Sequence, residues 1–174
     1  MQFELNSEYL DQLKTAIAEQ NDALLKAQLS ELYAVDIALI LNQLDLEDSI
    51  YLYDQIDEEL SSDVLLEMEE EKREALLATF STKEIAEQLD NMDSDDAADV
   101  INELPEDIQD EVLSHIEDIE QASDIADLMS FEEGTAGSLM AKELVSVYAH
   151  ETVSACIDEI RKQTENVDVL YAVY

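Results

Sequence analysis

The sequence predicts a mainly α-helical protein: a right-handed superhelix, or solenoid, of short helices on a 12-residue repeat, followed by a partial α/β segment of β-α-β order. Three observations predict this fold class. Apolar residues recur every twelve positions from residue 29 to residue 128, and helix-starting residues form a column between them. Both glycines of the 174-residue chain, Gly134 and Gly137, stand just after the repeat ends.

The composition is that of an acidic but folded protein. Eight Lys and Arg residues and 45 Asp and Glu residues give a formal net charge of −37, yet 47% of the residues are hydrophobic, enough to build a core. Nucleic acid is excluded as a partner because phosphate binding needs clustered Lys and Arg. The single cysteine, Cys156, rules out an internal disulfide, and no apolar run reaches the roughly 18 residues that span a bilayer. We therefore expect a soluble chain in a reducing, cytoplasmic setting.

The repeat is carried by columns of apolar residues. One column contains Leu32, Leu44, Ile56, Met68, Phe80, Met92, Leu104, Ile116 and Leu128. A second column, three positions earlier, contains Leu29, Leu41, Tyr53, Leu65, Leu77, Leu89, Ile101, Leu113 and Ile125. A third column is looser, because Gln88 and Asp124 interrupt the series Ile40, Leu52, Val64, Leu76, Val100 and Val112.

Each unit of the repeat predicts one short helix. Within a unit the apolar residues stand at i, i+1 and i+4, which is one face of an α-helix. Twelve residues at about 100° each turn that face by roughly 120°, so the chain must turn once per repeat. The turns coincide with residues that favour helix starts, namely Asp45, Asp57, Ser81, Asp93 and Pro105. We expect these helices to bury their stripes on one another over residues 29–128, after one or two longer helices over residues 7–28.

The pattern changes after Gly137. The stretches LVSVY (144–148) and VDVLYAVY (167–174) are rich in β-branched and aromatic residues, which favour strands. Between them, residues 152–163 carry apolar side chains at helical spacing behind a threonine cap. We therefore predict a β-α-β segment and two domains, an acidic helical domain over 1–130 and a linker with an incomplete α/β module over 131–174. The glycines mark the junction, where the backbone needs a positive φ or a close approach.

These residues resemble a known family. The stretch EEGTAGSLMAKELVSV (132–147), followed by a capped helix and LYAVY, is similar to the entry into the first CBS domain of the MgtE magnesium channels. Upstream, VDIALILNQLD (35–45) and MDSDDAADVINELPED (92–107) are similar to the helical N domain of that family. The resemblance covers nearly the whole chain.

The resemblance implies a regulatory role. In such channels the N and CBS domains form a cytosolic Mg²⁺ sensor that closes a homodimeric transmembrane pore when the ion is plentiful. It implies that the pore follows Tyr174 in the same polypeptide, at the cytoplasmic face of the cell membrane, that the chain dimerises through its CBS domains, and that other divalent cations and a CBS-bound nucleotide are further ligands to consider. By motif, the metal ligands of the family fall on Asp95, Asp99, the main-chain oxygen of Gly137 and, less directly, Asp63.

Spacing supports some of these ligands independently. Asp95, Asp99 and Glu103 follow one another at i, i+4 and i+8, so they line one helix face with neighbouring Cβ atoms about 6 Å apart. Like charges so arranged repel one another, and Mg²⁺, which prefers oxygen ligands, relieves the repulsion. The alternative is an ordinary solvated face, because 45 acidic residues produce such pairs by chance.

Two classes of function remain open. Enzyme activity is not expected, because no phosphate loop or nucleophile elbow is present. Zinc is not expected, because His115 and His150 lack partners at ligand spacing. The chain is then either a divalent-ion sensor or an acidic α-solenoid adaptor that presents a surface to a protein partner. The β-α-β segment favours the sensor, because an adaptor has no need of a second module after its glycine junction.

Overall fold

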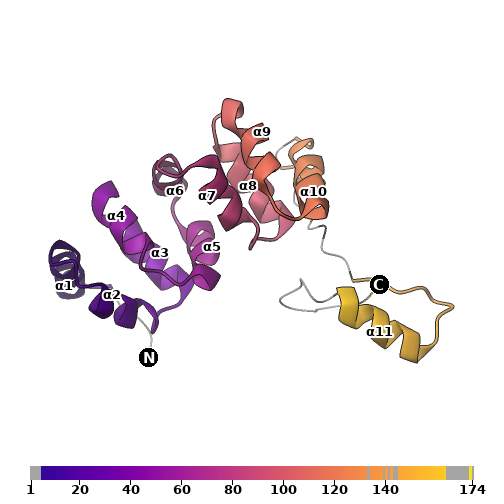
Figure 1. Ribbon diagram of the computed structural model, residues 1–174, viewed down its shortest axis with the longest axis horizontal. Coiled ribbons are helices and arrows are strands. Elements are labelled where there is room, and N and C mark those ends of the chain that lie inside the picture. Colours follow the sequence, from indigo (N-terminus) through magenta and orange to yellow (C-terminus); the bar gives the residue numbers. More distant parts are fainter. Residues whose placement is uncertain are drawn as a thin grey trace.

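The chain folds into a series of short α-helices. The computed structural model describes residues 5–132, 134–138, 140, 142, 145–163 and 173. Within this part it contains α1 (Ser7–Ala18), α2 (Asp22–Leu29), α3 (Ala34–Asn42), α4 (Leu46–Tyr53), α5 (Glu58–Glu67), α6 (Glu70–Leu77), α7 (Thr82–Leu89), α8 (Ser94–Glu103), α9 (Glu106–His115), α10 (Ile119–Met129) and α11 (Val153–Gln163). Figure 1 shows α1 to α10 stacked into one elongated body, with α11 apart from it. None of the described helices combines the length and apolar character needed to cross a membrane.

The helix starts follow the 12-residue repeat. Helices α3 to α9 begin at residues 34, 46, 58, 70, 82, 94 and 106, and α10 begins one residue late, at Ile119. Helix α2 begins at Asp22, in the same register, so the repeat extends one unit further back than predicted. The predicted region of longer helices is therefore one 12-residue helix, α1, and one repeat helix of 8 residues, α2.

The predicted helix-start residues are confirmed as N-caps, and they act in different ways. Asp45 accepts a hydrogen bond from the backbone N–H of Asp48 at 3.0 Å, and Ser81 forms a capping box with Glu84. Asp57 and Asp93 stand at the same position without a side-chain cap hydrogen bond.

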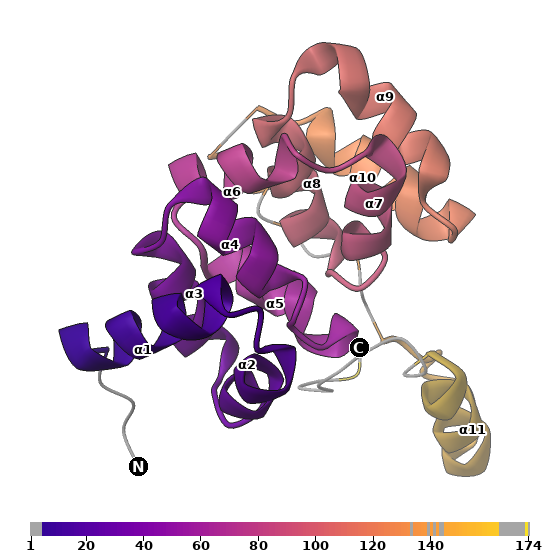
Figure 2. The same ribbon diagram turned by 60° about the vertical axis from the view of Figure 1, so that its left-hand side comes forward.

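The apolar columns form the core. Helices pack chiefly on the helix two places further along, such as α3 on α5, α7 on α9 and α8 on α10, and Figure 2 shows α8 and α10 within one lobe. Eight members of the second column are buried, namely Leu29, Leu41, Tyr53, Leu65, Leu77, Leu89, Ile101 and Ile125. Burying each such side chain contributes roughly 1.5–3 kcal/mol, which stabilises helices too short to persist alone.

The two interruptions of the third column are explained by polar contacts with other parts of the chain. The side-chain oxygen of Gln88 accepts hydrogen bonds from the hydroxyls of Tyr53 and Ser61, both at 2.8 Å. Burial raises the pKa of the Tyr53 phenol, so this network stays uncharged. Asp124 pairs with the ammonium of Lys142 at 3.5 Å. A polar residue in an apolar column therefore marks a position where it has a partner from another part of the chain.

The turns between helices are held by contacts that recur along the superhelix. The side chain of Asn42 accepts a hydrogen bond from the N–H of Glu69 at 3.2 Å. Four repeats later, Asp90 accepts an equivalent hydrogen bond from the N–H of Glu117 at 3.1 Å. The backbone repeat therefore preserves tertiary hydrogen bonds as well as apolar contacts.

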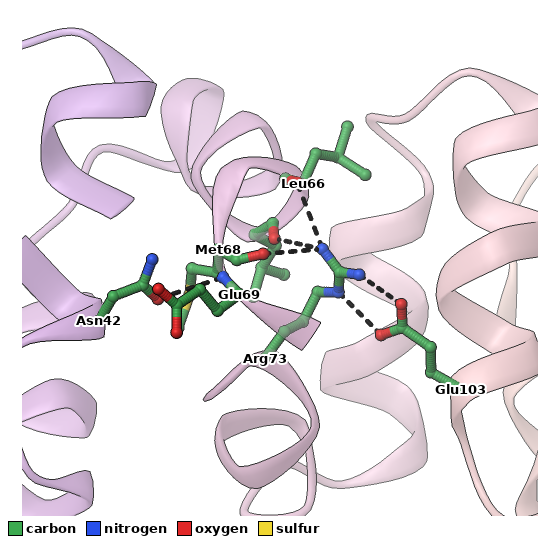
Figure 3. A network of polar contacts seen from close by, with 7 residues as sticks. Asn42, Leu66, Met68, Glu69, Arg73 and Glu103 are labelled. Atoms are coloured by element: carbon green, nitrogen blue, oxygen red, sulfur yellow. Dashed lines mark hydrogen bonds and ion pairs between the residues drawn. The ribbon is translucent and has the colours of Figure 1, made fainter. Parts of the chain in front are cut away.

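Arg73 connects three helices through a single guanidinium group (Figure 3). Its Nη1 donates to the carbonyl oxygens of Leu65, Leu66 and Met68 at the end of α5, at 3.1, 3.2 and 3.4 Å. Its Nε and Nη2 donate to both carboxylate oxygens of Glu103, the last residue of α8. This hydrogen-bonded pairing raises the pKa of Arg73, and both side chains are nearly buried, at 13% and 14% exposed. The end of α5, helix α6 and the end of α8 are thus held together.

The C-terminal segment departs from the β-α-β prediction. Helix α11 confirms the predicted helix, but residues 145–148 form no strand, and residues 167–174 lie outside the described residues except Val173. A strand requires a hydrogen-bonded neighbour, which β-branched composition alone does not supply. The side-chain amide of Gln163 occupies that place at Ser146, accepting from its N–H at 2.8 Å and donating to its carbonyl at 3.0 Å.

The apolar stripe of α11 is not covered by the described residues. Val153 is 77% exposed and Ile157 is 44% exposed, and Cys156 is only partly buried. An amphipathic helix is stable when this stripe is packed against another element.

Removing the guanidinium group of Arg73 is expected to destabilise the helical body. We expect Arg73→Met to lower the free energy of unfolding by about 3 kcal/mol, because it leaves Glu103 and three carbonyl groups without their donor in a nearly buried place. Urea unfolding followed by circular dichroism measures this change.

The matched control is Lys83→Met, which removes a positive charge from an exposed pair with Glu87 on α7. That change is expected to cost less than about 1 kcal/mol. Equal unfolding midpoints for the two variants would show that Arg73 contributes no more than a surface charge.

Candidate metal site

Three carboxylates gather at the start of α8. The side chains of Asp93, Asp95 and Asp96 each place an oxygen within 4.8 Å of the others, and this is the one group of three potential metal ligands found among the described residues. Asp95 is partly buried, whereas Asp93 and Asp96 are exposed. The positive end of the helix dipole favours acidic residues here, which explains how three like charges are tolerated in one turn.

The group has the chemistry of a site for a hard divalent cation. Carboxylate oxygens are the ligands that Mg²⁺ and Ca²⁺ prefer, and Mg²⁺ keeps several of its waters when it binds to proteins. Ligand oxygens on opposite sides of a Mg²⁺ ion lie only about 4.2 Å apart, twice the usual metal–oxygen distance. Three carboxylate oxygens within 4.8 Å of one another are close enough to contact one ion directly or through its waters.

The acidic row predicted from spacing is only partly brought together. Asp95 belongs to the group at the start of α8, and Asp99 lies exposed further along the helix. Glu103 is removed from the row because Arg73 binds it. The pKa of Arg73 is raised chiefly by its hydrogen bond to Glu103, and the negative charge of Asp99 adds to this effect.

Spacing along the sequence did not predict Asp93 and Asp96 as candidate ligands. Spacing arguments treat residues one apart as pointing in different directions, which is true inside a helix. Asp93 is the N-cap of α8, with φ −63° and ψ 152°, so its backbone is extended and the spacing rule for residues inside a helix does not apply to it. The signal available in the sequence was the run DSDD at a predicted helix start.

Asp63 lies apart from this group in the sequence. It is an exposed residue of α5, and it is not one of the three gathered carboxylates. In the repeat it occupies the same position as Asp99, three units earlier, which is a solvent-facing position. Its role as a ligand stays a prediction.

The two glycines of the linker are required for different reasons. Gly134 has φ +74°, a conformation that favours glycine. Gly137 has no positive φ, but a Cβ there would lie 2.5–2.9 Å from three ring atoms of Phe131. The expected tight junction is therefore formed by one left-handed residue and one close approach.

The linker returns to the start of α8. The backbone N–H of Lys142 donates to the hydroxyl oxygen of Ser94 at 3.4 Å, and Ser94 is fully buried. Because Ser94 stands between Asp93 and Asp95, this contact brings the linker to the same turn as the gathered carboxylates.

Comparison with known proteins identifies the helical body. Residues 32–134 match the family described as the MgtE intracellular N domain, which is more than half of the chain. The chain belongs to this family. The match runs from just before α3 into the linker, so the gathered carboxylates and Gly134 lie within the MgtE N domain.

Individual relatives agree with this assignment. The magnesium transporter MgtE of Enterococcus faecalis (strain ATCC 700802 / V583) is 34% identical over 55 residues, which cover 32% of this chain and 12% of that protein. A crystal structure of the soluble part of a magnesium transporter is similar with a TM-score of 0.75 at 25% identity, covering 96% of this chain and 66% of that one. The cytosolic domain of the Mg²⁺ channel MgtE in complex with ATP has a TM-score of 0.82 at 22% identity, covering 95% and 67%, and shows the fold alone. The chain thus corresponds to part of longer proteins.

The close approach at Gly137 predicts a specific pair of compensating changes. Gly137→Ala is expected to disturb the linker of this MgtE N domain, because its Cβ overlaps the ring of Phe131. In a Phe131→Ala background the same change is expected to have no further effect. Thermal unfolding and amide exchange of the linker, measured for the four proteins of this double-mutant cycle, check the coupling. Additive effects would show that the glycine is not there to accommodate the ring.

Proposed function

We propose that this chain is the cytosolic magnesium-sensing region of a magnesium channel or transporter, and that it closes the pore when Mg²⁺ is abundant. The helical domain, residues 1–130, docks through bound ions onto a CBS module that begins within residues 131–174. The observation that carries the proposal is the gathering of Asp93, Asp95 and Asp96 beside the linker, in a member of the MgtE N domain family.

The switch rests on electrostatic repulsion that a divalent ion reverses. The chain carries a formal net charge of −37, so its acidic surfaces repel one another when the ion is scarce. Two like charges 4 Å apart interact by about 4 kcal/mol near a protein surface, which is enough to separate two modules joined by a linker. An ion shared by carboxylates of both modules changes the sign of that interaction, and the closed arrangement becomes the more populated one.

The ligands on this chain come from α8, the linker and α5. Asp95, with Asp93 and Asp96, supplies carboxylate oxygens at the start of α8. Gly137 supplies a main-chain oxygen from the linker, and Asp99 and Asp63 supply further carboxylates along the acidic face. These oxygens suit Mg²⁺ and, with less selectivity, other divalent cations.

The remaining parts of the mechanism belong to the longer polypeptide. The pore is its transmembrane domain, so the chain lies at the cytoplasmic face of the cell membrane. Two copies associate through their CBS modules. A nucleotide is a further ligand of those modules, as the ATP complex of a relative of the same fold suggests.

Magnesium is expected to stabilise the chain through the start of α8. We expect millimolar MgCl₂ to raise the unfolding temperature above that in NaCl of equal ionic strength, because an ion that binds the folded form adds about 2.7 kcal/mol at one hundred times its Kd. Asp95→Asn with Asp96→Asn is expected to remove most of this increment. Differential scanning calorimetry measures it.

The control is Asp110→Asn with Glu111→Gln, which removes two exposed charges from α9. An equal loss in both variants would assign the effect to the diffuse acidic field. If NaCl and MgCl₂ raise the unfolding temperature equally, the effect is charge screening, and this result would contradict the sensor function. Asp95→Asn with Asp99→Asn then tests whether the site extends along α8.

A second candidate, the acidic adaptor, is favoured by an apolar surface on α3. Val35 and Leu39 are 47% and 49% exposed, and Tyr33, just before the helix, is 78% exposed. In most other repeats the positions of Val35 and Leu39 carry charged residues, including Glu47, Glu59, Asp63, Glu71, Lys83, Glu87, Asp95, Asp99, Asp107 and Glu111. An apolar pair that interrupts a charged column is a feature of contact surfaces.

Restoring charge at these two positions separates the candidates. Val35→Glu with Leu39→Glu is expected to leave folding unchanged within about 0.5 kcal/mol, because both positions are exposed. If the chain is a sensor, flux through the full-length protein keeps the same dependence on cytosolic Mg²⁺. A changed dependence in this variant, with none in the Asp95→Asn/Asp96→Asn variant, would favour the adaptor.

A further inference from the structure

Lys142 is a residue at which the described part of the linker contacts the helical body. Its backbone N–H donates to Ser94 at the start of α8. Its ammonium group lies 3.2 Å from a carboxylate oxygen of Asp127 and 3.5 Å from one of Asp124, both on α10. One linker residue thus contacts two helices that pack directly on each other.

The helical body presents an acidic side chain here, at a repeat position that is otherwise mostly apolar. Asp124 occupies the third repeat column, where six of the other units carry Ile, Leu or Val. Its side chain is only 34% exposed, and a carboxylate held partly out of water requires a counter-charge. The repeat departs from its apolar pattern at the position where Lys142 arrives.

Lys142 itself is more enclosed than the other paired lysines among the described residues. The side chain of Lys142 is 22% exposed, whereas those of Lys83 and Lys162, which pair within their own helices, are 71% and 72% exposed. The hydrogen bond to Asp127 raises the pKa of Lys142, with the charge of Asp124 adding to it, so the ammonium stays charged at neutral pH.

We propose that Lys142 is a tethered cation that seats the linker on α8 and α10 without any bound metal ion. The contacts that carry this are its ion pairs with Asp124 and Asp127 and its backbone hydrogen bond to Ser94. Lys142 is a positioning residue, because it holds the linker beside the gathered carboxylates and is not itself a metal ligand.

A consequence for ion binding follows, and it rests on the proposed sensor function. A linker that is already seated presents its main-chain oxygens near the start of α8 before the ion arrives. If the linker is seated for only a fraction of the time, the apparent affinity for Mg²⁺ falls by that fraction. Lys142 therefore favours ion binding. If the ammonium competed with the ion for the carboxylates, Lys142 would instead weaken Mg²⁺ binding.

The contact of the linker with α8 and α10 is tested first without magnesium. Amide hydrogen exchange of the linker is measured in EDTA at low ionic strength, on the 174-residue chain and on Lys142→Met, Lys142→Arg and Lys83→Met. We expect severalfold faster exchange around residue 142 in Lys142→Met, recovery in Lys142→Arg, and no change in Lys83→Met, which removes an exposed charge from α7. In 1 M NaCl, where the screening length falls to about 3 Å, the unmodified chain is expected to exchange as fast as Lys142→Met.

A second variant removes the carboxylates that pair with Lys142. Asp124→Asn with Asp127→Asn is expected to speed linker exchange as Lys142→Met does, and the combination of all three changes is expected to add nothing further. Equal exchange in the unmodified chain and Lys142→Met, or additive effects in the combined variant, would overturn the proposal.

Magnesium titration forms a separate arm of the experiment. We expect Lys142→Met to weaken Mg²⁺ binding severalfold by calorimetry, with Lys83→Met unchanged. Tighter binding in Lys142→Met would show competition and overturn this consequence. If the unmodified chain binds no Mg²⁺, the sensor function fails, while the exchange measured in EDTA still decides whether Lys142 seats the linker.

Discussion

The repeat helices α3 to α10 depend on packing their apolar stripes against a helix two places away in the chain, and α2 packs on α1. Helices α2 to α9 are 8 to 10 residues long, too short to persist in water without such packing. This constraint explains why the second column stays apolar from Leu29 to Ile125 while the outer positions vary freely. It also explains how so acidic a chain folds, because the carboxylates are placed on the surface that the packing leaves exposed.

Two of the few positively charged residues of this chain lie at contacts that hold helix α8. Of the eight Lys and Arg residues, Arg73 and Lys142 are nearly enclosed, and they meet the two ends of α8 and its neighbours. Arg73 holds Glu103 at one end, and Lys142 contacts Ser94 at the other. The candidate metal site therefore lies on a helix that is held at both ends, which favours a fixed arrangement of its carboxylates.

The linker joins this helix to the rest of the molecule through small, specific contacts. Gly134 supplies a left-handed turn, and Gly137 leaves room for the ring of Phe131. Beyond Lys142, the extended segment at Ser146 is held by the side-chain amide of Gln163 instead of a neighbouring strand. Gln163 thus satisfies the backbone polar groups of Ser146, while the described residues leave the apolar stripe of α11 exposed.

The sequence by itself determined the helical repeat, its period and its helix starts, because apolar periodicity and N-cap residues such as Asp45 and Ser81 act locally, within one turn. It also marked Gln88 and Asp124 as irregular without showing why. Only the tertiary structure decided that Tyr53, Ser61 and Lys142 are their partners, that Glu103 pairs with Arg73 rather than with an ion, and that Asp93 turns toward Asp95. The first four pairings join residues 18 to 35 positions apart that meet only after the helices have packed, and the last depends on the backbone conformation at a helix cap.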